Sequence, residues 1–289
     1  MKHLNTFQRI LRHPVNRNHA AAALLRYLRW QIGSRLVPGG VAVPFVNEAV
    51  LMISPGMHGA TQNIYCGIND YQDMSFLLHL LRPGDLFVDV GANVGAYTVL
   101  ASAAIGARSM ACEPNPHTLV KFRRNVMLNG ISDLVDERPV AVGAETKMIR
   151  LFTGTTDAMN RVVEDDQARD TIEVRQSPLD AMLDGRALRL LKVDVEGYEP
   201  AVLAGACRAL VHPELLGVIV ESNAEEQGRA SPHAVLLGYG FQLCSYEPRT
   251  RTLLPMQNAG DNGLYVRDLQ RTQSLLREAP SFTVFGERF

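Results

Sequence analysis

The sequence predicts an α/β fold built on a mostly parallel, doubly wound sheet. The first observation is a short apolar run, 86–90, which leads into a glycine-containing turn and then into apolar residues at helical spacing. The second is that runs of strand length then alternate with helical segments. The third is a pair of strands near the end of the chain, 241–246 and 263–267, with no helical pattern between them. Such a pair predicts an antiparallel hairpin at one edge of the sheet.

The elements follow in order along the chain. Besides the run 86–90 and the terminal pair, strands are expected at 108–113, 136–142, 188–193 and 216–220, giving seven in all. Helices are expected at 74–81, 95–104, 117–129, 200–210, 232–238 and 268–279. Strands at 148–152 and 171–176 enclose a polar loop, 153–170, and interrupt the alternation. We expect this insertion to form a β flap that covers the substrate.

The composition is that of an ordinary globular protein, with 46% hydrophobic and 20% charged residues among 289. We expect a main domain, 61–289, preceded by an extension, 1–60. No apolar run has the length of a membrane span, and the N-terminus lacks a signal-peptide core. The four cysteines have no metal-binding or disulfide spacing. They predict reduced thiols and a cytoplasmic location.

Positive charge is concentrated near the start of the chain. Residues 1–47 contain seven Lys or Arg and no acid, which leaves the remainder near −8. The main domain has no basic stripe with interleaved aromatic residues, so a nucleic-acid partner is not expected.

Two short helices are expected in this extension, at 4–12 and 18–34. In the second, one face holds Leu24, Leu25, Leu28 and Ile32, and the other holds Arg26, Arg29 and Trp30. We expect the apolar face to pack on the domain or on a second copy in a homodimer. Because basic amphipathic helices also bind anionic surfaces, residues 18–34 have a second interpretation as a peripheral contact with the inner face of a membrane or with a partner protein.

The turn after the strand 86–90 differs from a dinucleotide-binding fingerprint. Its glycines, Gly91 and Gly95, have the spacing G-x-x-x-G, and Asn93 stands near the place of the glycine that approaches a pyrophosphate. Asp89, at the end of the strand, would repel a phosphate. We therefore predict a ligand with a cationic amino group and no phosphate, such as S-adenosylmethionine (SAM). Glu113, at the end of the next strand, would accept hydrogen bonds from the ribose hydroxyls.

Four segments resemble the FkbM family of SAM-dependent methyltransferases: 87–100, 112–116, 125–129 and 191–199, the last reading L-K-V-D-V-E-G-Y-E. The pairing of D-V-G-A-N-x-G with a later K-x-D-x-E-G-x-E carries the resemblance, which covers roughly residues 60–225. It implies a class I methyltransferase fold and O-methylation, often of sugar or polyketide hydroxyls. The residues expected to hold SAM are Asp89, Gly91, Ala92, Asn93, Gly95, Glu113 and Pro114.

Further residues have two open interpretations. Asp133 either approaches the adenine amine or only shapes a turn. Asp70 and Asp73 either cap the helix 74–81 or touch the amino group of the cofactor.

Methyl transfer to an alcohol requires removal of a proton, and three acids are candidates for it. Asp194 and Glu221 end adjacent strands, and Glu196 follows Asp194 by two residues. Acids that meet at one rim raise one another's pKa, which suits a general base. We expect these three to orient and deprotonate the acceptor, a sugar, a glycan or another small polar metabolite.

Neighbouring residues have purely structural interpretations as well. Glu196 has an equally open role as a helix cap, Glu199 is expected to be a helix N-terminal acid, and Lys192 is expected to form a structural ion pair.

Three alternatives remain. Asp194, Glu221 and Asn223 are hard oxygen ligands, so a variant assisted by Mg²⁺ is one; no other metal site is expected. A nicotinamide-dependent oxidoreductase is disfavoured by the missing phosphate glycine and by the terminal hairpin. The third is a non-catalytic SAM-fold scaffold recruited through its basic N-terminal helix.

Overall fold

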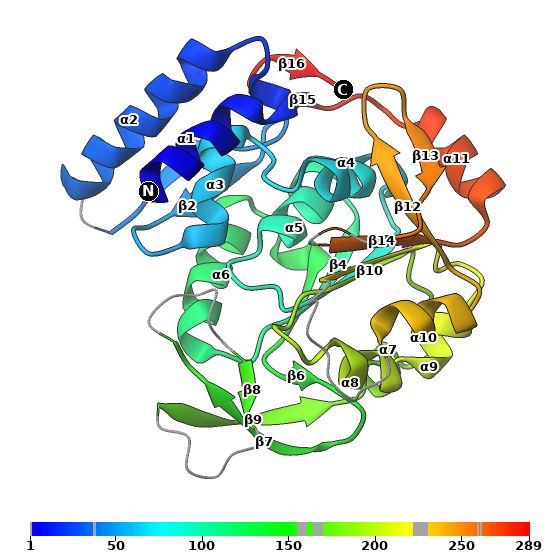
Figure 1. Ribbon diagram of the computed structural model, residues 1–289. Coiled ribbons are helices and arrows are strands. Elements are labelled where there is room, and N and C mark those ends of the chain that lie inside the picture. The colour runs from blue at the N-terminus through cyan, green and yellow to red at the C-terminus, as the bar shows by residue number, and fades with distance from the viewer. Residues whose placement is uncertain are drawn as a thin grey trace.

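The computed structural model describes residues 2–36, 39–154, 161–163, 170–221, 231–258, 260 and 262–289. Its centre is an eight-stranded sheet of order β13-β12-β14-β11-β10-β3-β4-β5 (Figure 1). The strands are β3 (Leu86–Val90), β4 (Arg108–Cys112), β5 (Val135–Arg138), β10 (Leu190–Val193), β11 (Gly217–Glu221), β12 (Gln242–Glu247), β13 (Thr252–Pro255) and β14 (Asn262–Val266).

The predicted fold class is confirmed, and the number of strands is corrected. The strands β5, β4, β3, β10 and β11 are parallel, whereas β14 is antiparallel to both β11 and β12. The eighth strand is β13, which pairs with β12 before the chain reaches β14. The two strands of the expected antiparallel pair are β12 and β14, and they do pair. They are not consecutive in the chain, because β13 comes between them and pairs with the outer edge of β12.

The chain reverses its direction across the sheet between β3 and β10. From β3 it proceeds through β4 to β5, and it then returns to place β10 on the other side of β3. The parallel register pairs Lys192 with Asp89, so both side chains lie on the same face of the sheet. Ligands of doubly wound proteins bind outside the carboxyl ends of the strands at such a reversal.

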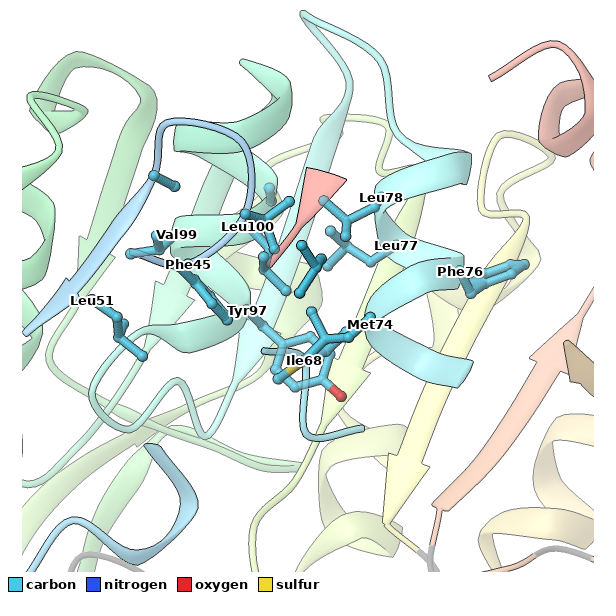
Figure 2. Close-up of a cluster of buried hydrophobic side chains, with 14 of the residues drawn as sticks. Phe45, Leu51, Ile68, Met74, Phe76, Leu77, Leu78, Tyr97, Val99 and Leu100 are labelled. Carbon is cyan, nitrogen blue, oxygen red and sulfur yellow. The ribbon is translucent and has the colours of Figure 1, made fainter. Parts of the chain in front are cut away.

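Each face of the sheet packs against its own hydrophobic cluster. In β3, Phe87 belongs to one cluster, and Val88 and Val90 belong to the other. Figure 2 shows part of the first cluster, where side chains of α4 meet Tyr97, Val99 and Leu100.

The first cluster includes residues of α3 (His58–Cys66), α4 (Tyr71–Leu80), α5 (Ala96–Val99), the π-helix η2 (Leu100–Ile105), α6 (Pro116–Leu128) and α11 (Leu269–Arg277). The second includes residues of α7 (Leu179–Leu183), α8 (Glu199–Ala204), α9 (Cys207–Val211) and α10 (Pro232–Gly238).

The N-terminal extension folds onto the first cluster. It contains α1 (Lys2–Arg12), the 3-10 helix η1 (Pro14–Asn16), α2 (Ala20–Leu36) and a hairpin of β1 (Val41–Pro44) with β2 (Val50–Ile53). The helix α3 is not among the helices that the sequence predicts.

The structure contradicts packing of the predicted apolar face of α2 on the domain, whereas contact of that face with a second copy, a membrane or a partner protein stays a prediction. The buried residues of α2 are Ala23, Tyr27 and Trp30, whereas Leu25 and Leu28 of the expected inner face are exposed. Aromatic packing explains the reversal, since large rings bury more apolar area than leucine.

The predicted strand 136–142 is two strands in two sheets. Pro139 follows β5 and has no N–H to continue the ladder, and β6 (Ala141–Val142) then pairs with β9 (Thr171–Ser177). A second sheet of order β6-β9-β7-β8 results, with β7 (Lys147–Phe152) and β8 (Arg161–Val163). The inserted β element is thus present, and its role as a cover for the substrate stays a prediction.

The remaining short elements are the 3-10 helix η3 (Ser132–Leu134) and a hairpin of β15 (Thr283–Val284) with β16 (Glu287–Arg288). Among the described helices, none has both the length and the apolar character needed to cross a bilayer.

Candidate active site at the carboxyl edge of the sheet

The turn after β3 requires glycine at position 91. Gly91 has a φ of +77°, and a Cβ there would lie 1.9 Å from the backbone oxygen of Asp194. The N–H groups of Gly91 and Ala92 donate to the carbonyl of Cys112 at 3.0 and 3.1 Å. The turn is therefore held where the ends of β3, β4 and β10 meet, as the sequence predicts.

Glu113 connects this turn to the end of β4. Its carboxylate accepts hydrogen bonds from the N–H groups of Asn93 at 3.0 Å and Asn115 at 2.9 Å. Burial raises the pKa of Glu113 to about 7, although these two hydrogen bonds oppose the rise. The half-buried Pro114 follows directly. The structure thus brings together the turn and the acid that the sequence assigned to the ribose.

The other end of the turn also depends on glycine. Gly95 has a φ of +88°, and a Cβ there would lie 2.9 Å from the ring of Phe122. Asn93, with a φ of +50°, adopts the left-handed conformation that asparagine tolerates better than most residues. All of the predicted turn residues therefore lie in one tight segment beside Glu113.

A buried ion cluster lies on the face of the sheet beside the turn. Asp89 accepts a hydrogen bond from Thr98 Oγ1 at 2.8 Å, and its other carboxylate oxygen is 3.7 Å from Lys192 Nζ. Lys192 Nζ also lies 3.0 Å from Asp194 Oδ2 and 4.9 Å from the ring centre of Tyr97. Burial acts to lower the pKa of Lys192, but Asp194 and Asp89 outweigh it and raise that pKa above its ordinary value. The ion-pair role predicted for Lys192 is confirmed.

Two acids from the segment 70–73 reach the same region. Asp70 precedes α4 but makes no capping hydrogen bond; instead it accepts one from the hydroxyl of Tyr97 at 3.0 Å. Burial raises the pKa of Asp70, against the effects of Tyr97 and Lys192. Asp73, inside α4, accepts a hydrogen bond from Asn262 Nδ2 at 2.9 Å, and burial raises its pKa to about 7. Asp70 therefore holds the N-cap position of α4 without capping it through its side chain, and Asp73 is not a cap because it lies within the helix.

Tyr97 is the residue that sequence reasoning missed. Its position in the helix after the glycine turn marks it only as a core residue, and it does lie in the hydrophobic cluster of Figure 2. Its hydroxyl nevertheless donates a hydrogen bond to Asp70, and Lys192 Nζ lies over its ring. The only signal in the sequence was the presence of a polar group on an otherwise apolar helix face.

The three predicted catalytic acids converge at the rim. One carboxylate oxygen each of Asp194, Glu196 and Glu221 lies within 4.8 Å of the others. Asp194 follows β10 and Glu221 ends β11, so the parallel strands bring them side by side. Burial raises the pKa of Glu221 to about 7, and the neighbouring charges of Asp194 and Glu196 add to the rise.

Glu199 fixes the backbone of the turn that carries Glu196. Its Oε1 accepts hydrogen bonds from the N–H groups of Val195 at 3.1 Å and Gly197 at 3.2 Å. As the first residue of α8, it has the helix N-terminal role predicted for it. The cap position of α8 is held by Tyr198, so Glu196 is not its N-cap. Glu196 sits on the turn that Glu199 fixes, with a φ of +54°.

The structure does not bring Asp133 to this edge. Asp133 lies in η3, ahead of β5, and lines a cavity of about 370 Å³ with Leu86 and Arg108, the first residues of β3 and β4. The amino ends of parallel strands lie at the opposite edge of the sheet from the glycine turn. Asn223, considered above as a ligand of Mg²⁺, lies outside the described residues.

The residues at this edge of the sheet fit a cationic cofactor without phosphates. The buried Lys192 pairs with Asp89 and Asp194, and its charge also acts to lower the pKa values of Asp70 and Asp73. Among the described residues, Asp89 Oδ1 has this ion pair but accepts no hydrogen bond. This excess of carboxylates favours the ammonium and sulfonium groups of SAM and disfavours a pyrophosphate. Glu113 already accepts two hydrogen bonds from backbone N–H groups, and its carboxylate has further lone pairs that can accept hydrogen bonds from ribose hydroxyls.

The rim acids would also suit Mg²⁺, which prefers carboxylate oxygens. Clusters of exposed acids are common without an ion, so we assign no step to a metal.

Comparisons with known proteins agree with this geometry. The profile of the methyltransferase FkbM domain matches residues 89–248, which is more than half of the chain. The 31-O-demethyl-FK506 methyltransferase FkbM of Streptomyces tacrolimicus is 29% identical over 241 residues, covering 72% of this chain and 88% of that protein. A ribosomal protein L11 methyltransferase of Syntrophomonas wolfei is 30% identical over 147 residues, covering 48% of this chain and 44% of that protein.

Among solved structures, a methyltransferase FkbM from Methylobacillus flagellatus aligns with 85% of this chain and 60% of its own, at 17% identity and a TM-score of 0.45. The match of the family profile, joined with the site described above, settles the assignment. The chain belongs to the FkbM family of SAM-dependent methyltransferases.

Proposed function

We propose that this methyltransferase acts on a hydroxyl group of a sugar, a glycan or another small polar metabolite. The observation that carries the proposal is the convergence of Asp194, Glu196 and Glu221 beside the cofactor turn. An alcohol oxygen is a poor nucleophile until its proton is removed, and a rim of carboxylates provides the base. The name of the Streptomyces relative, a 31-O-demethyl-FK506 methyltransferase, also describes methylation at oxygen.

The chain's own residues would hold the cofactor as follows. Glu113 would accept hydrogen bonds from the ribose, and the carboxylates of Asp70 and Asp89 would face its cationic part. SAM, when bound, supplies an electrophilic methyl group on a sulfonium sulfur. The protein is left to position the acceptor, exclude water and move one proton.

Glu221 is the proposed base. Its pKa of about 7 allows it to be ionised near neutral pH and still to accept a proton readily. Asp194 would orient the hydroxyl, because its salt bridge to the buried Lys192 fixes its position. With SAM bound, Glu221 would take the proton of the acceptor while the acceptor oxygen forms its bond to the methyl carbon. The bond between that carbon and sulfur would break in the same step, and S-adenosylhomocysteine would leave.

The experiment is an incubation with ¹³C-methyl SAM and a panel of monosaccharides, polyols and amino sugars, followed by NMR. O-methyl and N-methyl carbons resonate at different chemical shifts, so one spectrum identifies the acceptor atom. We expect an O-methyl product. Label on the amine of an amino sugar, or only on added ribosomal protein or RNA, would contradict the proposal.

A cytoplasmic location and a homodimer stay predictions. The contact of the N-terminal helices with a membrane is a separate proposal, and it rests on different residues.

A further inference from the structure

The helix α2 presents an apolar stripe to solvent. The stripe consists of Leu25, Leu28, Ile32 and Leu36, whose exposed fractions are 47%, 50%, 61% and 74%. Intervals of three and four residues place them on one side of the helix. Single exposed leucines are common on protein surfaces, but an uninterrupted row of four marks an interaction site. Figure 1 shows α2 at the outer edge of the molecule, away from the central sheet.

The opposite side of α2 is fixed to the protein. The centre of the Tyr27 ring lies 4.8 Å from the centre of the Phe7 ring and 5.2 Å from the centre of the Tyr65 ring. Arg26 donates to the side-chain oxygen of Asn16 at 2.7 Å, and its guanidinium lies 3.7 Å from the ring centre of Phe285. Rotation of the helix to bury the apolar stripe would break all of these contacts. The stripe is therefore exposed because of the fold.

Positive charge surrounds the stripe. Arg29 and Arg35, both exposed, lie on either side of it along the helix, and the exposed Arg12 and Arg17 precede α2. Residues 1–47 contain no acid. A second copy docked on the stripe would bring two basic helices together, which like-charge repulsion disfavours. A surface of negative charge above an apolar layer complements both features.

We propose that α2 binds the surface of an anionic lipid bilayer, with the apolar stripe inserted among the acyl chains and the arginines at the headgroups. Helices that lie in a membrane interface combine these two features, and their binding is reversible and sensitive to salt. The proposal concerns where the enzyme works and does not depend on the identity of its acceptor.

The test is co-sedimentation of the full chain with vesicles of phosphatidylcholine alone or mixed with phosphatidylglycerol. We expect binding to the anionic vesicles to be about tenfold tighter than to the neutral ones, and to weaken as salt is added. The double variant Leu28→Ser, Ile32→Ser should lose binding, and Arg29→Gln should weaken it. The control variants are Met127→Ser and Val211→Ser, which remove side chains of similar exposure, 74% and 62%, outside α2. They should bind as the unchanged protein does.

Two further measurements distinguish loss of membrane binding from misfolding of the variant and from dimer formation. Thermal melting and binding of S-adenosylhomocysteine should be unchanged in the double variant, because both substituted residues are exposed. Light scattering should show the same mass for the unchanged protein and the variant. No binding to anionic vesicles, or binding that survives in the double variant, would overturn the proposal. So would a dimer that the double variant separates, since the stripe would then be an interface between copies.

Discussion

Glu221 combines two properties of a general base. It ends a strand at the carboxyl edge of the sheet, and its pKa is raised to about 7 by burial and by the acids beside it. Asp194 is more exposed, and its carboxylate is already paired with Lys192. These differences are why we propose Glu221 for proton removal and Asp194 for orientation of the acceptor.

The variant Glu221→Gln should lower kcat by about 10²–10⁴, the usual contribution of a positioned base. The affinity for SAM should not change, because Glu221 lies outside the glycine turn. In the unchanged enzyme, kcat should fall as the pH drops below about 7, since Glu221 is then protonated and cannot accept the proton. Initial rates and calorimetry across pH check this. A variant with full kcat would rule out Glu221 as the base.

The variant Gly91→Ala should destabilise the protein and abolish cofactor binding. A Cβ at Gly91 would collide with the backbone of Asp194, and backbone atoms cannot move aside as a flexible side chain can. The matched control is Gly84→Ala, where φ is +90° but no atom lies within 4 Å of the added Cβ. The control should cost only about 1–2 kcal/mol for its left-handed conformation. Urea denaturation of both variants measures the difference, and equal losses would contradict the close contact.

Methyl transfer should continue in excess EDTA. The proposed function gives the rim acids a role in proton removal, and Asp194 is already paired with Lys192, so no metal is needed to explain them. Activity is measured before and after chelation. Loss on chelation with recovery on adding Mg²⁺ would instead establish a metal held by Asp194, Glu196 and Glu221.

The residues at strand ends were the most predictable part of the site. The carboxyl ends of parallel strands share one edge, so Asp194 and Glu221 had to lie close once the strands were located. The roles of Asp70 and Tyr97 were not predictable, because their contact depends on how α4 packs against the helix after the turn. Asp133 was misplaced for a simpler reason: it precedes β5 instead of following it, and so it lies at the other edge.

Among the helices and strands, the existence of an element was easier to predict than the face it buries. Apolar residues occur all around α2, so periodicity alone could not choose between the leucines and the aromatic rings. The contacts of Tyr27 and Arg26 with residues far along the chain decided the orientation. The split between β5 and β6 has a local cause in Pro139, whereas β13 depends on pairing with β12 that no local pattern reveals.

The hydrogen bond between Asp73 of α4 and Asn262 of β14 leads us to predict that the stability of the protein depends on pH. Asp73 is buried, its partner is the neutral Asn262, and its pKa is raised to about 7. A carboxyl whose pKa is higher in the folded state than in the unfolded chain contributes stability at low pH, and this contribution is lost as the pH rises towards 7. The variant Asp73→Asn should therefore be more stable than the unchanged protein at pH 8 and similar to it near pH 4.

Thermal melting without cofactor, measured at both pH values, tests this prediction. The amide introduced by Asp73→Asn would remain neutral throughout, and its oxygen could still accept the hydrogen bond from Asn262. Greater stability of the variant at pH 4 only, or at neither pH, would contradict the burial of an ionisable carboxyl there.

For the molecule as a whole, the reversal of the chain between β3 and β10 determines where the candidate active site lies. It brings the glycine turn, the buried lysine and the rim acids to one edge, although they come from distant parts of the sequence. Membership of the methyltransferase family sets aside both the nicotinamide-dependent alternative and the non-catalytic scaffold. The N-terminal helices belong to the same hydrophobic cluster as the first face of the sheet, so point substitutions test them better than deletion does.

The central claim is that the carboxylates at the carboxyl edge of the sheet bind SAM. Isothermal titration calorimetry of the full chain with SAM, with S-adenosylhomocysteine and with NAD tests it most directly. We predict binding of the first two ligands, no binding of NAD, and a loss of about tenfold or more in SAM affinity for Glu113→Gln, which removes a charged acceptor of hydrogen bonds. Absence of binding to SAM and S-adenosylhomocysteine, or an unchanged affinity in Glu113→Gln, would contradict the account.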